Sequence, residues 1–217
     1  MRSTLRYGDC AVDVGAHKGG YLYWMRRAVG PTGRVFAFEP QQDLAQYLKE
    51  RVAEFAFDNV IVEGSALSDV AGHAILDVPG EGPACGATLE PGLPGSKISV
   101  AVEVRTLDEY FGARPGLRVA LIKCDAEGHE LRIFRGAETI LSEQRPILLF
   151  ECEARHNRRQ SIGDVFDLLG GLGYRGFFFR EGALLPLSQF VPAMQSRPKA
   201  RSYVNNFVFQ PSSTRPT

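Results

Sequence analysis

The sequence predicts an α/β fold with a mostly parallel sheet and a pair of antiparallel strands at its C-terminal end. Short apolar stretches alternate with stretches of helical periodicity along most of the chain. Residues 117–124 and 147–152 are continuous apolar runs, which are typical of strands buried on both faces. The first strand runs into a glycine turn and then a helix. Ligands of such folds collect at the carboxyl ends of the strands.

Length and composition place the chain among ordinary globular proteins. Its 217 residues suit one domain, and we expect residues 1–217 to form it, with a Gly/Pro-rich insertion around 79–97. The 25 basic and 25 acidic side chains give no net charge, so no global field favours nucleic acid or an anionic membrane, although a local patch stays possible. No apolar run is long enough to span a membrane, and no signal-peptide core is present, so the expected location is cytoplasmic.

The first third of the chain carries the strand–helix alternation. We expect strands at 11–14, 34–38 and 59–63, with helices at 21–29 and 41–55 between them. Gly15 and Gly19 follow the first strand and would let a ligand approach the main chain and the helix N-terminus. Glu39 ends the second strand, where doubly wound folds bind ribose hydroxyls. Together these features predict an adenosine-containing cofactor.

The middle of the chain breaks the alternation. Residues 73–78 and 98–104 read as extended strands. Residues 79–97 between them are rich in Gly and Pro, and a loop of this length is a binding loop, a lid or a disordered segment. We expect it to close over the cleft when ligands bind. Thr106 begins a capping box that opens a short helix through residue 111.

The second half returns to the α/β pattern. We expect helices at 127–143 and 161–170, and final strands at 174–180 and 203–209. None of the four cysteines forms a CxxC pair, so buried thiols are favoured over a metal site or a disulfide framework.

Two carboxylates, Asp125 and Glu127, follow the buried strand at 117–124. Such groups are costly to bury in the core, so at least one should face a ligand. The alternative is that one of them caps the following helix, and we expect capping for one and ligand contact for the other. Lys123, inside the apolar strand, is expected to extend to solvent or to pair with a carboxylate.

Six segments resemble the FkbM-type S-adenosylmethionine-dependent methyltransferases, and the resemblance spans nearly the whole chain. They are DVGAHKG at 13–19, FEP at 38–40, TLD at 106–108, IKCDAEGHE at 122–130, FRGA at 134–137 and NNFVF at 205–209. The resemblance implies a Rossmann-like class I methyltransferase fold with a mostly parallel seven-stranded sheet. It also implies methyl transfer from S-adenosylmethionine to a hydroxyl oxygen of a sugar, lipid or secondary metabolite.

The resemblance also implies roles by position. The methionine part of the cofactor would be held by Asp13, Gly15, His17 and Gly19, the ribose by Glu39 beside Pro40, and the adenine by Ser65 and Ala66. Asp125 would lie near the methyl group. Candidate catalytic groups are Asp125, Glu127 and His129, with His156 as a further candidate base.

The sequence leaves two questions open: whether the site holds a metal ion, and which class of function the protein has. Asp125 and Glu151 could instead hold Mg²⁺, an alternative we do not favour because few carboxylates make a weak site. Glu151 could alternatively pair with Arg155 or Arg158. The rival functions are an NAD(P)-binding oxidoreductase, which the spacing of Gly15 and Gly19 does not fit, and a non-catalytic nucleotide-binding protein of the same fold. No nucleic-acid partner is expected.

Overall fold

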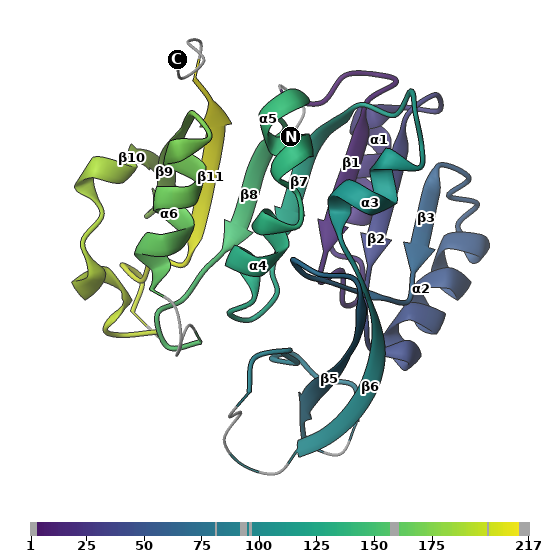
Figure 1. The fold of residues 1–217 in the computed structure, drawn as a ribbon, viewed down its shortest axis with the longest axis horizontal. Coiled ribbons are helices and arrows are strands. Elements are labelled where there is room, and N and C mark those ends of the chain that lie inside the picture. Colours follow the sequence, from purple (N-terminus) through teal and green to yellow (C-terminus); the bar gives the residue numbers. More distant parts are fainter. Residues whose placement is uncertain are drawn as a thin grey trace.

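The computed structural model describes residues 4–80, 82–91, 95, 97–156, 161–198 and 200–212. In these residues the larger sheet has eight strands, in the order β10-β9-β11-β8-β7-β1-β2-β3 (Figure 1). Their bounds are β1 (Cys10–Val14), β2 (Arg34–Phe38), β3 (Val60–Glu63), β7 (Val119–Cys124), β8 (Ile147–Glu151), β9 (Tyr174–Arg180), β10 (Ala183–Pro186) and β11 (Asn206–Pro211). β1, β2, β3, β7 and β8 are parallel neighbours, and β11 lies antiparallel between β8 and β9.

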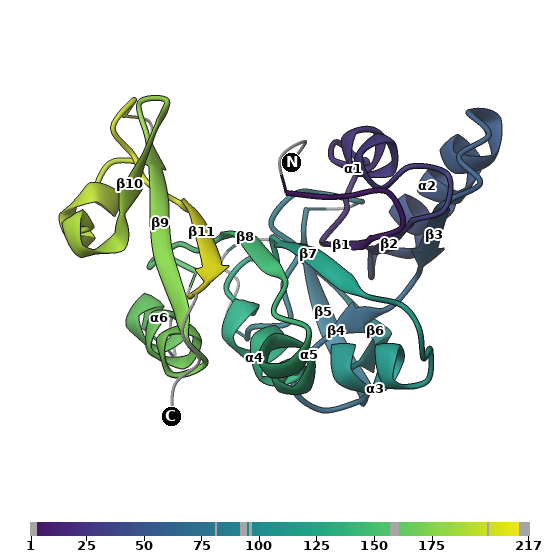
Figure 2. The same ribbon diagram turned by 90° about the horizontal axis from the view of Figure 1, so that it is seen from above.

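Helices cover both faces of this sheet. They are α1 (Leu22–Val29), α2 (Gln42–Glu54), α3 (Leu107–Gly112), α4 (Glu130–Arg135), α5 (Glu138–Glu143) and α6 (Ile162–Gly171), followed by the 3₁₀ turns η1 (Leu187–Gln189) and η2 (Pro192–Gln195). Figure 2 shows α1 and α2 on one face and α3, α4, α5 and α6 on the other. The sheet is therefore the middle layer of three. No helix in the described part of the chain is long and apolar enough to cross a bilayer.

A smaller sheet of β4 (Ala66–Leu67), β5 (Gly72–Pro79) and β6 (Lys97–Arg105) lies beside the edge where β1, β2, β7 and β8 end (Figure 1). The sequence predicts β5 and β6 but not the two-residue strand β4, which is too short to show periodicity. β5 and β6 pair antiparallel along their whole length. The hairpin therefore brings residues 84–89, which follow β5, to the edge of the larger sheet where β1, β2 and β7 end.

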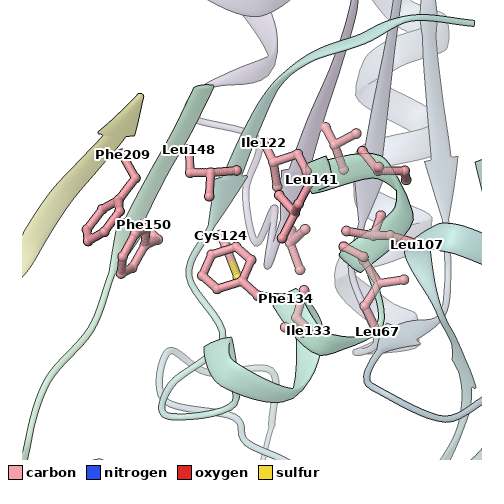
Figure 3. Close-up of a cluster of buried hydrophobic side chains, with 14 of the residues drawn as sticks. Leu67, Leu107, Ile122, Cys124, Ile133, Phe134, Leu141, Leu148, Phe150 and Phe209 are labelled. Atoms are coloured by element: carbon pink, nitrogen blue, oxygen red, sulfur yellow. The ribbon is translucent and has the colours of Figure 1, made fainter. Parts of the chain in front are cut away.

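The main core lies between the sheet and α3, α4 and α5. Phe134 and Phe150 pack edge to face there with their ring centroids 5.2 Å apart, and Phe209 packs on Phe150 at 5.5 Å (Figure 3). β7 is buried at every position, as its continuous apolar run predicts. The other apolar run, in β8, alternates between buried and half-buried residues, so it does not meet the prediction of a strand buried on both faces. β1 is buried throughout although it carries Asp13. The buried thiols of Cys10 and Cys124 belong to this core, so the prediction of free, buried cysteines is confirmed for these strands.

The helix predicted over 127–143 is wrong, because two six-residue helices separated by Gly136 and Ala137 occupy this region. A Cβ on Gly136 would lie 2.0 Å from the backbone oxygen of Ser68, so the chain bends here to pass the end of β4. The N-terminus of α5 has no cap of its own. The carboxylate of Asp108 accepts hydrogen bonds from Thr139 N and Ile140 N instead, at 2.8 and 2.9 Å.

The larger sheet also contains an eighth strand, β10, which is not part of the predicted seven-stranded sheet. β9 turns directly into β10 through Glu181 and Gly182, whose φ angles are 50° and 82°. A two-residue loop with two positive φ angles is the favoured turn for a tight hairpin. β11 also begins three residues later than predicted, at Asn206.

Candidate functional site

One cavity of about 220 Å³ lies at the carboxyl ends of β1, β2 and β7, beneath the loop that follows β5. Its lining comes from stretches that are far apart in the sequence. They are residues 14–17 and 38–41 from the first two strand ends, 65–67 and 84–89 from the smaller sheet and its loop, and 125–129 from the turn after β7. The fold therefore brings most of the predicted site residues together at the predicted edge.

The first wall of the cavity consists of Gly15, His17, Glu39 and Gln41. Glu39 is buried, and its two carboxylate oxygens accept hydrogen bonds from His17 N at 2.8 Å and Gln41 N at 2.9 Å. Burial raises the pKa of Glu39, and these two backbone donors oppose the rise. Each oxygen keeps a second acceptor position, so the carboxylate can still bind hydroxyls in the cavity.

Gly15 and Gly19, the two glycines of the turn, are needed for packing within the protein and not only for the approach of a ligand. A Cβ on Gly15 would lie 2.0 Å from the backbone oxygen of Asp125, and one on Gly19 would lie 2.9 Å from Leu48 Cδ2. Both residues also have positive φ angles. Gly15 allows the ends of β1 and β7 to touch, whereas Gly19 packs on α2 and does not line the cavity.

Asp13 lies behind the cavity rather than in its wall. It is completely buried, and Lys123 Nζ lies 3.1 Å from its Oδ1. Lys123 also donates to the carbonyl oxygens of Val14 and Gly15. Burial would lower the pKa of Lys123, but Asp13 and Asp125 raise it, so the ammonium stays charged. The predicted pairing of Lys123 with a carboxylate is confirmed, and Asp13 can act on a ligand only through Lys123.

Ser65 and Ala66 lie in the cavity, as the resemblance implies. The hydroxyl oxygen of Ser65 is buried and has no hydrogen-bond partner among the described residues. Buried hydroxyls are normally hydrogen-bonded, because leaving one unpaired costs about 1–3 kcal/mol. The Ser65 hydroxyl is therefore available to hydrogen-bond a molecule that enters the cavity.

The second wall consists of Asp125, Glu127 and His129. The expectation that Asp125 or Glu127 caps the next helix is wrong, because the N-cap position of α4 is His129 and no side chain caps it. Glu130, the first residue of the helix, instead holds the preceding turn, since its Oε1 accepts from Ala126 N at 3.0 Å and from Gly128 N at 3.2 Å. Asp125 and Glu127 both line the cavity.

Glu127 is held in a strained turn. Its φ is 50°, in the left-handed region that non-glycine residues rarely adopt. Its carboxylate lies 2.8 Å from His156 Nδ1, and a Cβ on Gly128 would lie 2.7 Å from the backbone oxygen of His156. The hydrogen bond to Glu127 raises the pKa of His156. The segment after β8 therefore packs tightly against this turn.

His129 is buried, with both ring nitrogens engaged. Its Nδ1 lies 2.7 Å from Glu90 Oε1, and its Nε2 lies 2.9 Å from Ser68 Oγ. The His129 side chain thereby links the turn after β7 to the loop that follows β5 and to the residue directly after β4. It has no free nitrogen to take a proton from a substrate, so the geometry does not favour the predicted role as base.

A cover loop, which we define as residues 82–91, lies over the cavity. The side-chain amide of Gln41 forms two hydrogen bonds with the backbone of Ala84, at 2.9 and 3.1 Å. Thr88 exchanges backbone hydrogen bonds with Asp77 and donates its hydroxyl to the carbonyl oxygen of Glu127. The described part of the loop is therefore an ordered cover. Residues 81, 92–94 and 96 of the predicted insertion lie outside the described residues.

A third group of polar side chains lies past the second wall, at the end of β8. Burial, and next the charge of Asp125, raises the pKa of Glu151 to about 8. Burial would raise the pKa of Glu153 too, but hydrogen bonds from Arg155, Tyr203 and Asn205 lower it to about 2. Glu151 also accepts a hydrogen bond from Asn205 Nδ2 at 2.7 Å.

This arrangement is unfavourable for the alternative metal site. In the described part of the chain, no three His, Cys, Asp or Glu side chains are grouped so that they could hold a metal ion. The suggested partner Arg158 lies outside the described residues, and Arg155 bonds to Glu153 instead.

Gln41, Thr88 and Glu90 tie the cover loop to the two walls, and the sequence did not predict these roles. A glutamine and a threonine give no chemical signal, and their partners lie 43 and 39 residues away along the chain. Glu90, the one charged residue between positions 82 and 96, is the exception that gives a hint.

Comparisons with known proteins show which protein family this chain is similar to. A model of the methyltransferase FkbM domain matches residues 13–175. A protein-L-isoaspartate O-methyltransferase from Ignicoccus hospitalis is 35% identical over 60 residues, which are 28% of this chain and 28% of that protein.

Among solved structures, methyltransferase FkbM from Methylobacillus flagellatus has a TM-score of 0.60 and 19% identity over 95% of this chain and 45% of that one. A Streptococcus mutans protein in complex with SAH has a TM-score of 0.52 and 9% identity over 96% and 92% of the two chains. The chain thus spans less than half the length of the first relative and of the first structure. The predicted class I methyltransferase-like fold is confirmed.

Proposed function

Because this chain belongs to the FkbM methyltransferase family, we propose that it transfers a methyl group from S-adenosylmethionine to a hydroxyl oxygen of a small molecule. The observation that supports this most is the pairing of two groups in one cavity. The buried carboxylate of Glu39 and the unpaired hydroxyl of Ser65 both line it. A ribose and a base offer the donors and acceptors that these groups lack.

The residues of the cavity fit an adenosine-containing cofactor. Glu39 would bind the ribose hydroxyls with its remaining acceptor positions, and Ser65 would bond to the adenine beside Ala66. Gly15, His17 and Pro40 would complete the first wall around the cofactor. Asp13 and Gly19 would act from behind this wall, through Lys123 and through packing on α2.

S-adenosylmethionine supplies an electrophilic methyl group on a sulfonium sulfur. Asp125 lines the cavity and stands at the end of β7, where its carboxylate would accept a hydrogen bond from the acceptor hydroxyl and then take the proton. Burial raises the pKa of Asp125, and Lys123 opposes the rise. A carboxylate with a raised pKa is a stronger base, so this environment suits proton removal.

Glu127 and His156 would support Asp125 from the side. Their hydrogen bond fixes the turn that carries the second wall, and it leaves His156 as a second proton acceptor near the same edge. The acceptor class implied by the family is a sugar, lipid or secondary metabolite. The compound itself would be found by mass spectrometry, as a gain of one CH₂ unit in a library of such hydroxyl compounds.

Cofactor binding is the first test. Calorimetry with S-adenosylmethionine and, separately, NAD should show binding of the first alone. Glu39→Gln should weaken it by roughly 1.5–3 kcal/mol and Ser65→Ala by about 1 kcal/mol, the range for lost hydrogen bonds. Ser142→Ala, on the exposed side of α5, is the control. Binding of NAD with no response to S-adenosylmethionine would overturn the proposed function.

The role of Asp125 is tested separately with an acceptor from the library. Asp125→Asn should lower kcat by roughly 10²–10⁴ with little change in cofactor affinity. The exposed residue Asp43 supplies a matched control, Asp43→Asn. EDTA should leave the rate unchanged, and a rate lost to EDTA and restored by Mg²⁺ would revive the metal alternative. Full activity of Asp125→Asn would exclude Asp125 as the base while leaving methyl transfer intact.

A further inference from the structure

A row of aromatic rings lies on the outer surface of α1 and the end of α2. We call Tyr23, Trp24, Phe55 and Phe57 the aromatic ridge. Successive ring centroids along it are 5.1 Å apart from Trp24 to Tyr23, 6.4 Å from Tyr23 to Phe57 and 5.7 Å from Phe57 to Phe55. Trp24 is 56% exposed and Phe55 is 58% exposed. Contiguous exposed rings of this kind mark an interaction site more often than single exposed apolar residues do.

The ridge is flanked by two arginines. Arg26 Cζ lies 4.3 Å from the ring centroid of Phe57, and Arg27 Cζ lies 5.5 Å from that of Tyr23. Within the described part of the chain, these guanidiniums donate hydrogen bonds to the side chain of Asn59 and to the Tyr23 hydroxyl, which are both neutral groups. Stacking on rings holds both charges at the surface, where they can reach a partner.

The surroundings leave this face locally positive although the whole chain carries no net charge. α1 contains no acidic residue. At the end of α2, Glu54 is bonded to Arg51 at 2.5 Å. Near them the exposed Asp58 carries one negative charge, and Arg34, which begins the neighbouring strand, carries one positive charge. A partner that complements this face is therefore anionic.

The position of the ridge separates it from the candidate active site. α1 and α2 form the outer layer on one face of the sheet (Figure 2), and none of the ridge residues lines the cavity. Tyr7, 76% exposed, places a further ring against Gly30 just after α1. The ridge can therefore be occupied without closing the cavity.

The chemistry of the ridge distinguishes between partners. A second copy of this chain would place the arginines of one ridge near those of the other. Single-stranded nucleic acid needs free ring faces for base stacking, but guanidiniums already lie over Tyr23 and Phe57. Tryptophan and tyrosine are enriched at the headgroup level of bilayers, and arginine bonds well to phosphate.

We propose that the aromatic ridge docks this protein onto an anionic phospholipid surface, with its rings among the headgroups and Arg26 and Arg27 on lipid phosphates. Peripheral binding of this kind combines apolar burial with attraction to anionic lipid. It involves no membrane-spanning segment and does not depend on which acceptor is methylated.

Trp24 is the only tryptophan of the chain, so it reports directly on this surface. Phosphatidylcholine vesicles that contain phosphatidylglycerol should shift Trp24 emission to shorter wavelength and carry the protein down on sedimentation. Pure phosphatidylcholine should do so much less, and raised salt should reverse the binding, because exposed charges are screened. The absence of binding to the anionic vesicles at low salt would overturn the proposal.

Substitutions on the aromatic ridge test whether this surface makes the contact with the vesicle. Arg27→Glu and Phe55→Ser should each weaken vesicle binding roughly tenfold. The matched controls are Arg135→Glu, on the exposed side of α4, and Phe179→Ser, a 43% exposed ring on β9, and both should bind within about twofold of the unchanged protein. Circular dichroism checks that all four variants fold. Equal losses in test and control variants would contradict the proposal.

Two further outcomes would assign the ridge to another partner and overturn the proposal. Tight binding of a single-stranded oligonucleotide that quenches Trp24, and is lost in Arg27→Glu, would assign it to nucleic acid. A mass that doubles with concentration in the unchanged protein but not in Phe55→Ser would assign it to a second copy of this chain. Both are measured on the same four variants.

Discussion

The two walls of the cavity are built in different ways. In the first wall, Glu39 bonds to the backbone of His17 and Gln41, and all three groups lie at the ends of adjacent strands. In the second wall, Glu127 and His129 are held by the cover loop, by β4 and by the segment after β8. The bonds of Glu39 in the first wall thus join the ends of two paired strands, whereas the second wall depends mainly on contacts between segments that are more distant in sequence. Mutations should therefore affect the two walls differently.

The largest effect is expected where the two walls meet, at Gly15. In Gly15→Ala the new Cβ would lie 2.0 Å from Asp125 O, and the φ of 67° would strain any side chain. We expect a loss of about 3 kcal/mol or more in the free energy of unfolding, from overpacking together with backbone strain. Urea denaturation measures it. In the control Gly20→Ala the Cβ meets nothing within 4 Å, and a similar loss there would contradict this explanation.

A pH-dependent effect is expected at Glu130, which supports the second wall. Burial raises its pKa from 4.5 to about 7, so between these pH values the folded state keeps a proton that the unfolded state has released. The resulting stabilisation is complete below pH 4.5 and is lost as the pH rises through 7. The wild type should therefore lose on the order of 2–3 kcal/mol over this range relative to Glu130→Gln.

Unfolding free energies of the two proteins at several pH values test this. Glu138→Gln, at an exposed position of α5, is the control and should follow the wild type. Parallel pH curves for wild type and Glu130→Gln would show that Glu130 is ionised at no extra cost in the folded protein.

His129→Ala should loosen the second wall and leave the first unchanged. The variant loses the contacts to Glu90 and Ser68, which should cost about 1–3 kcal/mol locally. Hydrogen exchange should become faster in the cover loop and around Glu127 but not at His17. Turnover that falls by roughly 10²–10⁴ while exchange in the loop stays unchanged would instead identify His129 as the general base.

The smallest effect is expected at Gln41, where the cover loop meets the first wall. Gln41→Ala removes the two bonds to Ala84, a loss of about 1 kcal/mol for a partly exposed pair. Faster exchange should be confined to residues 82–86, and S-adenosylhomocysteine should slow it if the loop closes on ligand. Gln46→Ala, at an exposed position of α2, is the control. If hydrogen exchange in the loop changes neither in Gln41→Ala nor on addition of S-adenosylhomocysteine, the loop is a passive insertion.

Local sequence features determined much of the fold. The buried strand β7 could be recognised because a strand covered on both faces favours a nearly continuous run of apolar residues. α1 and α2 followed from periodicity, and Glu39 from its place at the end of the second strand. In each case the signal lies within one element, or within two elements joined by a short connection.

The tertiary structure alone decided the rest, because it depends on which distant groups meet. Gly136 ends α4 because β4 passes against it, and Asp108 caps a helix that begins thirty residues later in the chain. His129 looked free to act as a base until Glu90 and Ser68 were found on its two nitrogens. A side chain's chemistry is set by its residue type, but its role is set by the partners that satisfy its hydrogen bonds, and those partners are fixed only when the chain folds.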